Sequence, residues 1–185
     1  MSIDYIQSVV NDIEKNNKDY WRKVTEIRDN KNLSHVGKVK LISEAYAEAR
    51  GKWKDLKAKY RSGIDNENYR LRHAVFSGKK GNELSYRDAL NTAAETKDLD
   101  ALLTRAMQTG DADLRQAVIY QAFEDGKFSL LDRVSAEDGA VKNLLDFDRT
   151  FGKNASPSTK FELNIMTRGP EKVQEVDTLT VNQAI

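Results

Sequence analysis

The chain has no cysteine and only two histidines among its 185 residues, and these absences exclude several kinds of chemistry. Without cysteine there can be no disulfide, no thiol nucleophile and no Cys-ligated zinc or iron–sulfur site. The two histidines, His35 and His73, lie in different parts of the sequence, so we expect neither a metal site nor a proton relay built on histidine.

Long apolar runs are also absent. No run approaches the roughly 20 residues that a membrane-spanning helix needs, and the N-terminus lacks the basic and apolar regions of a signal peptide. Charged residues make up 32% of the chain. We therefore expect a soluble protein with no membrane contact. Its length predicts one domain, or one domain with appendages.

Proline occurs only at Pro157 and Pro170, so the first 156 residues lack the strongest helix breaker. Residues 1–77 carry two patterns in which one face recurs at intervals of three and four, the heptad spacing of paired helices. The first pattern comprises Ile3, Ile6, Val10, Ile13, Asn17, Tyr20, Val24 and Ile27, and the second comprises Val39, Ile42, Tyr46, Ala49, Trp53, Leu56 and Tyr60.

The link between the two patterns is short and polar and ends in Ser34, a good N-cap. It predicts a long antiparallel helical hairpin in which Tyr20 lies near Ile42 and Tyr46. Asn17, the polar member of the first pattern, is expected to set the register of the two helices.

Residues 84–151 read as short helices separated by glycine and aspartate turns, which predicts a small helical bundle. The composition then shifts towards Ser, Thr, Asn and Val over residues 152–185. Phe161, Leu163 and Ile165 alternate with other residues in a partial strand pattern, and Leu179 to Val181 form a weaker one. We interpret this segment as an extended C-terminal arm with strand-forming patches; a disordered tail is the alternative. The predicted fold class is all-α.

The net charge of +1 hides a segregation of charge along the chain. Residues 50–80 carry ten basic and three acidic side chains, whereas residues 81–150 carry eight basic and fourteen acidic ones. A basic helix followed by an acidic bundle favours association between copies or with a partner. Contact with nucleic acid is the second interpretation, and a solvated helix face is the third.

No segment matches a catalytic motif, so we expect no enzymatic activity, cofactor or metal site. The segment Ser77 to Gly81 resembles a phosphate-binding loop but lacks its spacing and its hydroxyl residue. Three aspartate pairs could in principle bind Mg²⁺. Because two of them lie where helices are predicted to begin, we expect capping and solvation instead. The pairs are Asp98/Asp100, Asp111/Asp113 and Asp146/Asp148.

Two stretches of the chain resemble small helical structural and assembly proteins of tailed phages that infect Gram-positive, especially actinobacterial, hosts. The first stretch contains Ile27-Arg28-Asp29, Leu33-Ser34, Gly37-Lys38 and Ala45-Tyr46-Ala47-Glu48-Ala49. The second contains Tyr86-Arg87-Asp88-Ala89-Leu90, Leu102-Leu103, Ala106, Thr109-Gly110-Asp111, Leu114, Ala117-Val118, Ala122 and Gly126. The resemblance covers roughly residues 20–150. It implies a structural or assembly role in the virion, in contact with other virion proteins such as portal, capsid or tail components, and no catalysis.

We therefore expect a non-enzymatic virion protein at the head or head–tail junction, assembled in the host cytoplasm. The alternatives are an assembly factor, such as a scaffold or a tail-assembly chaperone, and a nucleic-acid-binding regulator that uses residues 50–80. The residues predicted to contact partners are the basic side chains Arg61, Arg70, Arg72, Lys79 and Lys80 and the apolar side chains Phe161, Leu163, Ile165, Leu179 and Val181.

Overall fold

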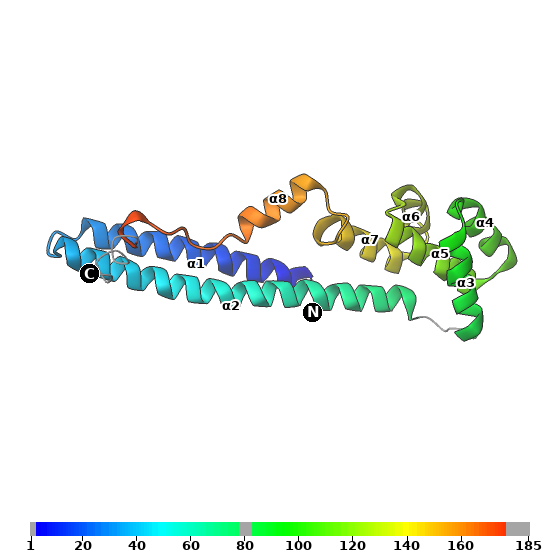
Figure 1. Ribbon diagram of the computed structural model, residues 1–185, viewed down its shortest axis with the longest axis horizontal. Coiled ribbons are helices and arrows are strands. Elements are labelled where there is room, and N and C mark those ends of the chain that lie inside the picture. Colours follow the sequence, from blue (N-terminus) through cyan, green and yellow to red (C-terminus); the bar gives the residue numbers. More distant parts are fainter. Residues whose placement is uncertain (1–2, 78–82, 177–185) are drawn as a thin grey trace. The chain divides into compact units, whose positions relative to one another are not determined.

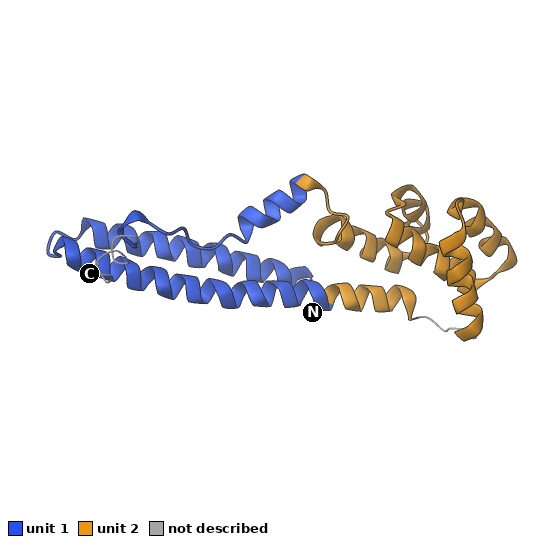
Figure 2. Cartoon of the chain, in the orientation of Figure 1, with its two compact units in different colours: residues 1–66, 158–185 blue, residues 67–157 orange. Residues whose placement is uncertain are grey.

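The computed structural model describes residues 3–77 and 83–176, and over these ranges the chain forms helices and no β-strand (Figure 1). The predicted all-α class is confirmed. The chain divides into two compact units, residues 1–66 with 158–185 and residues 67–157 (Figure 2). The sequence patterns predict different boundaries between parts of the chain. The boundaries differ because one long helix continues past residue 66 and contributes to both units. The C-terminal segment also belongs to the same unit as the first two helices.

The first unit is built on an antiparallel pair of long helices, α1 (Ile3–Asp29) and α2 (His35–Phe76). Figure 1 shows α1 lying along α2. The first helix ends in a short turn, and α2 begins where the Ser34 hydroxyl accepts a hydrogen bond from the backbone N–H of Gly37 at 3.1 Å. Ser34 thus caps the helix as the sequence predicts.

The interface of α1 and α2 consists of the apolar faces that the heptad spacing identifies. Tyr20 and Ile42 belong to one buried cluster, and the rings of Tyr20 and Tyr46 lie 6.1 Å apart, as predicted. Near the start of α1, Gly63 of α2 lies against the Ile6 and Tyr5 side chains. A β-carbon there would lie 3.3 Å from the Ile6 side chain, so a small residue permits this contact.

The C-terminal part of the first unit is helical where a strand pattern was predicted. Helix α8 spans Pro157–Met166 and contains Phe161, Leu163 and Ile165. The prediction of a strand was wrong because three alternating apolar residues fit either structure. The Ser156-Pro157 pair is a signal for the start of a helix, because proline suits the first turn of a helix. The prediction from the alternating pattern did not take this signal into account. Residues 167–173 then run without regular structure to a single helical turn at 174–176.

The second unit contains the last ten residues of α2 and five shorter helices. These are α3 (Glu83–Glu95), α4 (Leu99–Thr109), α5 (Ala112–Asp125), α6 (Phe128–Ser135) and α7 (Gly139–Phe151). Helix α5 is central, since it packs against α3, α4 and α6, and α6 packs against α7. The end of α2 joins this unit through Phe76, whose ring meets Tyr120 and Phe123 edge-on.

Local signals set the ends of these helices. Helices α4 and α5 end at Gly110 and Gly126, whose backbone φ angles of 68° and 66° suit glycine. The buried core of the unit includes Leu103, Ala117, Val118, Ile119, Leu131, Leu144, Leu145 and Phe147. Over residues 3–77 and 83–176, no helix combines the length and the apolar character that crossing a membrane requires.

Candidate functional site

Contacts between residues more than 100 positions apart join the hairpin to residues 167–176, which we call the strap. The strap runs over α1 and α2 within the first unit (Figure 1). Val173 is buried in the same cluster as Tyr20, Val24 and Ile42, and Val176 packs against that cluster. The strap is therefore part of the core of this unit.

Polar contacts fix the start of the strap on α2. The indole Nε1 of Trp53 donates a hydrogen bond to the Thr167 carbonyl oxygen at 3.0 Å. The ammonium group of Lys57 donates to the Thr167 hydroxyl at 2.6 Å, and that hydroxyl donates to the Leu163 carbonyl oxygen at 2.7 Å. Thr167 is 2% exposed, so these bonds satisfy a buried polar side chain. They also anchor the C-terminal end of α8 to α2.

Helix α1 holds the strap at two further points. The Asn17 side chain donates a hydrogen bond to the Arg168 carbonyl oxygen at 2.9 Å. The Arg28 guanidinium donates two hydrogen bonds to the Glu175 carboxylate, at 2.8 and 2.9 Å. These bonds hold the pKa of Glu175 below its ordinary value. The register-setting role of Asn17 stays a prediction, and the structure adds a contact of its amide with the strap.

The strap and α2 enclose a surface groove of about 550 Å³, which we call the strap groove. Its aromatic side is formed by Tyr46 and Trp53. The Arg50 guanidinium lies over the Tyr46 ring, 5.9 Å from its centre. The strap contributes Arg168, Gly169, Pro170, Glu171 and Lys172 to the lining.

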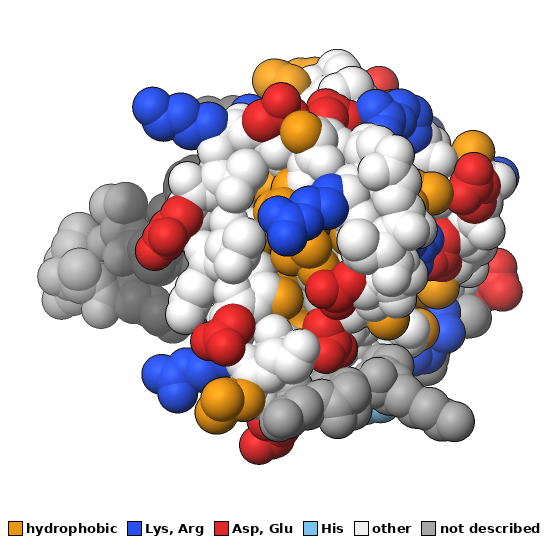
Figure 3. All heavy atoms as spheres, turned by 90° about the vertical axis from the view of Figure 1, so that its right-hand side faces the viewer, with side chains coloured by type: hydrophobic (Ala, Val, Ile, Leu, Met, Phe, Trp, Pro, Cys, Tyr) orange, Lys and Arg blue, Asp and Glu red, His pale blue; other side chains and the backbone are white. Residues whose placement is uncertain are grey.

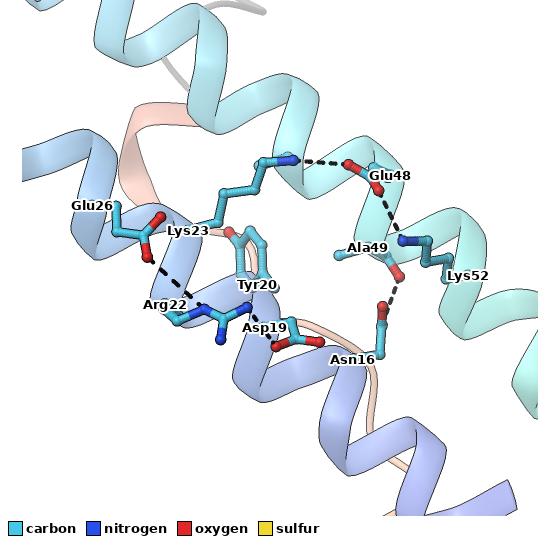
Figure 4. A pocket seen from close by; sticks show the side chains of 10 residues that line it. Asn16, Asp19, Tyr20, Arg22, Lys23, Glu26, Glu48, Ala49 and Lys52 are labelled. Carbon is cyan, nitrogen blue, oxygen red and sulfur yellow. Dashed lines mark hydrogen bonds and ion pairs between the residues drawn. The ribbon is translucent and has the colours of Figure 1, made fainter.

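A second, polar pocket of about 280 Å³ lies across α1 and α2 and is lined by charges of both signs (Figure 4). In its lining, Glu48 of α2 accepts hydrogen bonds from Lys52 at 2.8 Å and from Lys23 of α1 at 3.0 Å. These two bonds lower the pKa of Glu48 to about 2. The Asn16 side chain donates to the Ala49 carbonyl oxygen at 2.9 Å. The pocket is thus internally paired, with acidic and basic groups already matched.

Helix α8 presents the apolar residues predicted to contact a partner. Phe161 and Ile165 are 65% and 56% exposed, and Met166 is 43% exposed. Phe161 and Ile165 are four residues apart and therefore lie on one face of the helix. Leu163 is only half-buried, and no residue of α8 is fully buried. We call Phe161 and Ile165 the apolar face of α8.

The basic residues predicted to contact a partner differ in whether they already pair with an acidic side chain. Arg61 is exposed on α2 within the first unit. Arg70 donates to Glu67 at 2.7 and 2.9 Å. Arg72 donates to Glu124 at 2.6 Å, and its guanidinium lies 5.8 Å from the centre of the Tyr120 ring. Arg72 therefore ties the end of α2 to α5 inside the second unit, and Arg61 is the freest of the three.

Four of the predicted contact residues, Lys79, Lys80, Leu179 and Val181, lie outside the described residues. The loop that resembles a phosphate-binding loop also lies largely outside them. Of the predicted set, Phe161, Leu163 and Ile165 all lie on α8, and Phe161 and Ile165 share one face of it.

Two of the aspartate pairs begin helices as predicted. Asp98 accepts a hydrogen bond from the Ala101 N–H at 3.0 Å, and Asp111 accepts one from the Leu114 N–H at 2.9 Å. In residues 3–77 and 83–176, no three His, Asp or Glu side chains are grouped so that they could hold a metal ion.

Sequence reasoning placed Trp53 in the pairing face of α2 but missed the strap and the contacts of Thr167 with Trp53 and Lys57. No periodic signal could have found them, since a hydrogen bond between residues more than 100 positions apart leaves no spacing pattern. No protein-family model, curated protein or solved structure matches this chain.

Proposed function

We propose that this protein is a non-enzymatic structural component of a phage virion, at the head or head–tail junction, that docks through helical surfaces. The apolar face of α8 carries the proposal. Phe161 and Ile165 lie four residues apart and are mostly exposed, which is the pattern of an amphipathic helix that enters a groove on a partner. Large exposed apolar groups that lie together are characteristic of interaction surfaces.

The strap supports this proposal because it fixes where the apolar face is presented. Lys57 and Trp53 hold Thr167, the residue directly after α8. A helix held at its end loses less conformational freedom when a partner binds it, so more of the contact energy is available for docking. The resemblance to phage structural proteins supplies the class of partner, which is further copies of this chain or a neighbouring virion protein.

The test is the solution mass of the full chain by light scattering at high salt, where ionic contacts are screened. We expect the unmodified chain to form an oligomer and the Phe161→Ser/Ile165→Ser variant to be a monomer. The variant Glu162→Ser/Asn164→Ser is the matched control, because it changes two neighbouring exposed residues of the same helix. An oligomer that persists in the Phe161→Ser/Ile165→Ser variant contradicts the role of α8.

Truncation before α8 is a poor test of docking. It would also remove Val173 from the core and Glu175 from Arg28. A loss of association could then reflect an unfolded hairpin. The substitutions on α8 avoid this, because the residues they change are exposed.

A further inference from the structure

One face of α2 carries a line of positive charge with little internal compensation. Arg50, Lys54, Lys57 and Arg61 follow one another at intervals of four, three and four, and therefore lie on one side of the helix. We call these four residues the basic stripe. At 1.5 Å per residue it extends over about 16 Å of the helix.

The basic stripe is not neutralised within its own unit. Over residues 3–77 and 83–176, no carboxylate pairs with Arg50, Lys54 or Arg61, and all three are exposed. Lys57 bonds to Thr167, which is uncharged. Burial and the neighbouring charge of Arg61 lower the pKa of Lys57. Like charges on one helix face repel each other, so an external anion would stabilise this arrangement.

The strap groove extends the positive surface at one end of the basic stripe, because Arg50 belongs to both. Arg168 and Lys172 line the other side of the groove, and Arg168 pairs with Glu171 at 3.0 Å. The complementary surface must therefore be acidic and broad enough to meet a helix face.

The second unit offers such a surface beside α3. A groove of about 570 Å³ lies there and is lined by Leu84, Ser85, Asp88, Ala89, Thr92, Leu102, Arg105, Asp111 and Leu114. We call it the acidic groove. Asp88 lines the groove, and Glu95, seven residues further along α3, is exposed outside its lining. Neither carboxylate pairs with a basic side chain in the described ranges. Arg105 is the one basic residue in its lining.

Apolar groups lie beside the charges of this unit, as in many interfaces. Leu84, at the start of α3, is 69% exposed. On the face of the molecule seen in Figure 3, hydrophobic side chains gather near the centre beneath a basic side chain, with acidic and basic side chains around them. Residues 81–150 carry fourteen acidic and eight basic side chains. The charge of this region is thus opposite to that of the basic stripe.

We propose that the basic stripe of one copy of this chain docks on the acidic groove of a second copy. The inference rests on the proposed function and specifies how copies associate. The two surfaces are different and belong to different units, so the contact is head-to-tail and leaves one free surface of each kind on every pair. Repetition then produces a ring or an open chain. Opposite charges on the two surfaces select this pairing and speed up encounter.

The test is sedimentation velocity of the full chain at low and at high salt, combined with charge reversal. The first variant is Arg50→Glu/Arg61→Glu, the second is Asp88→Lys/Glu95→Lys, and the third carries all four changes. We expect the unmodified chain to form larger assemblies at low salt than at high salt, because salt screens the contact between the basic stripe and the acidic groove and leaves the apolar contact of α8 in place. Each two-residue variant alone should lose about tenfold or more in association constant, and the four-residue variant should regain association.

The matched control is Lys15→Glu/Lys40→Glu, which makes the same change in net charge at exposed positions of α1 and α2 outside the basic stripe. It should associate like the unmodified chain. A monomeric unmodified chain at low salt overturns the proposal. Unchanged association of the two-residue variants, or no recovery in the four-residue variant, also overturns it.

Two further outcomes separate this inference from its alternatives. Association that is equal at low and at high salt, and is lost in Phe161→Ser/Ile165→Ser, supports docking by α8 alone and overturns the ionic contact. Fluorescence anisotropy with a labelled single-stranded DNA tests whether the basic stripe binds nucleic acid instead of a second copy. A monomer that binds this DNA, and loses binding in Arg50→Glu/Arg61→Glu, overturns the second copy as the occupant in favour of nucleic acid.

Discussion

Gly169 lies so close to the Trp53 indole that a β-carbon at position 169 would come within 2.8 Å of the ring. The same indole donates its N–H to the Thr167 carbonyl oxygen two residues earlier. The strap therefore passes Trp53 at a distance that only glycine permits. This contact joins the C-terminal segment to the middle of α2 and holds α8 at its end.

Replacement of Gly169 by alanine should displace the strap. Because the added methyl group cannot fit against the ring, we expect the free energy of unfolding to fall by about 1–3 kcal/mol. Urea unfolding followed by Trp53 fluorescence, in a Trp21→Phe background, measures this change. Gly51→Ala is the control, since nothing lies within 4 Å of its β-carbon position. It should raise stability by about 0.5–1 kcal/mol, as alanine does in a helix. Equal stability of Gly169→Ala and the unmodified chain would contradict the close contact.

The ion pair of Arg28 and Glu175 should make stability depend on pH. Arg28 holds the pKa of Glu175 below its ordinary value, so the pair stabilises the folded state above the unfolded pKa and loses this effect as pH falls through the lower, folded pKa. Both side chains are partly exposed, and we expect Glu175→Gln to cost about 0.5–1 kcal/mol near neutral pH.

This difference should shrink as the pH falls below about 4. Urea unfolding at several pH values tests it. The control Glu171→Gln removes a more exposed pair with Arg168 and should change stability by less than about 0.5 kcal/mol. A difference for Glu175→Gln that stays constant down to low pH would show that the carboxylate is not paired.

Glu48 should titrate far below an ordinary glutamate. Its hydrogen bonds from Lys52 and Lys23 lower its pKa to about 2. An NMR titration of the side-chain carboxyl carbon measures this value directly. Lys23→Gln removes the partner on α1 and should raise the pKa of Glu48, whereas Lys18→Gln, which lies near Glu14 on α1, should leave it unchanged. An ordinary pKa for Glu48 in the unmodified chain would mean that these bonds do not persist in solution.

Asp111 should stabilise the second unit as a helix cap and not as a metal ligand. Its carboxylate accepts from the Leu114 N–H at the start of α5, and we expect Asp111→Ala to lower the free energy of unfolding by about 1 kcal/mol. Thermal unfolding followed by circular dichroism measures the change. Asp146→Ala, at an exposed position within α7, is the control and should have little effect. Stabilisation by Mg²⁺ that is lost in Asp111→Ala would instead indicate a metal site.

The sequence by itself determined the helical character of the chain and the sides of α1 and α2 that meet. Both follow from spacing within a few turns of one helix, so residues such as Ile13, Tyr20 and Ile42 are buried as their period predicts. The caps at Ser34, Asp98 and Asp111 are equally local, because each side chain bonds an N–H three residues later.

The tertiary structure alone decided the path of the C-terminal segment. The choice between helix and strand at Phe161 to Ile165 was ambiguous in a short apolar pattern, and the contacts of the strap join residues more than 100 positions apart. Trp53 belongs to the heptad pattern of α2, but its fit with Thr167 and Gly169 carries no periodic signal, since that fit depends on the three-dimensional surface of the hairpin. Local propensity therefore specified the helices, and long-range packing determined which surfaces they leave exposed.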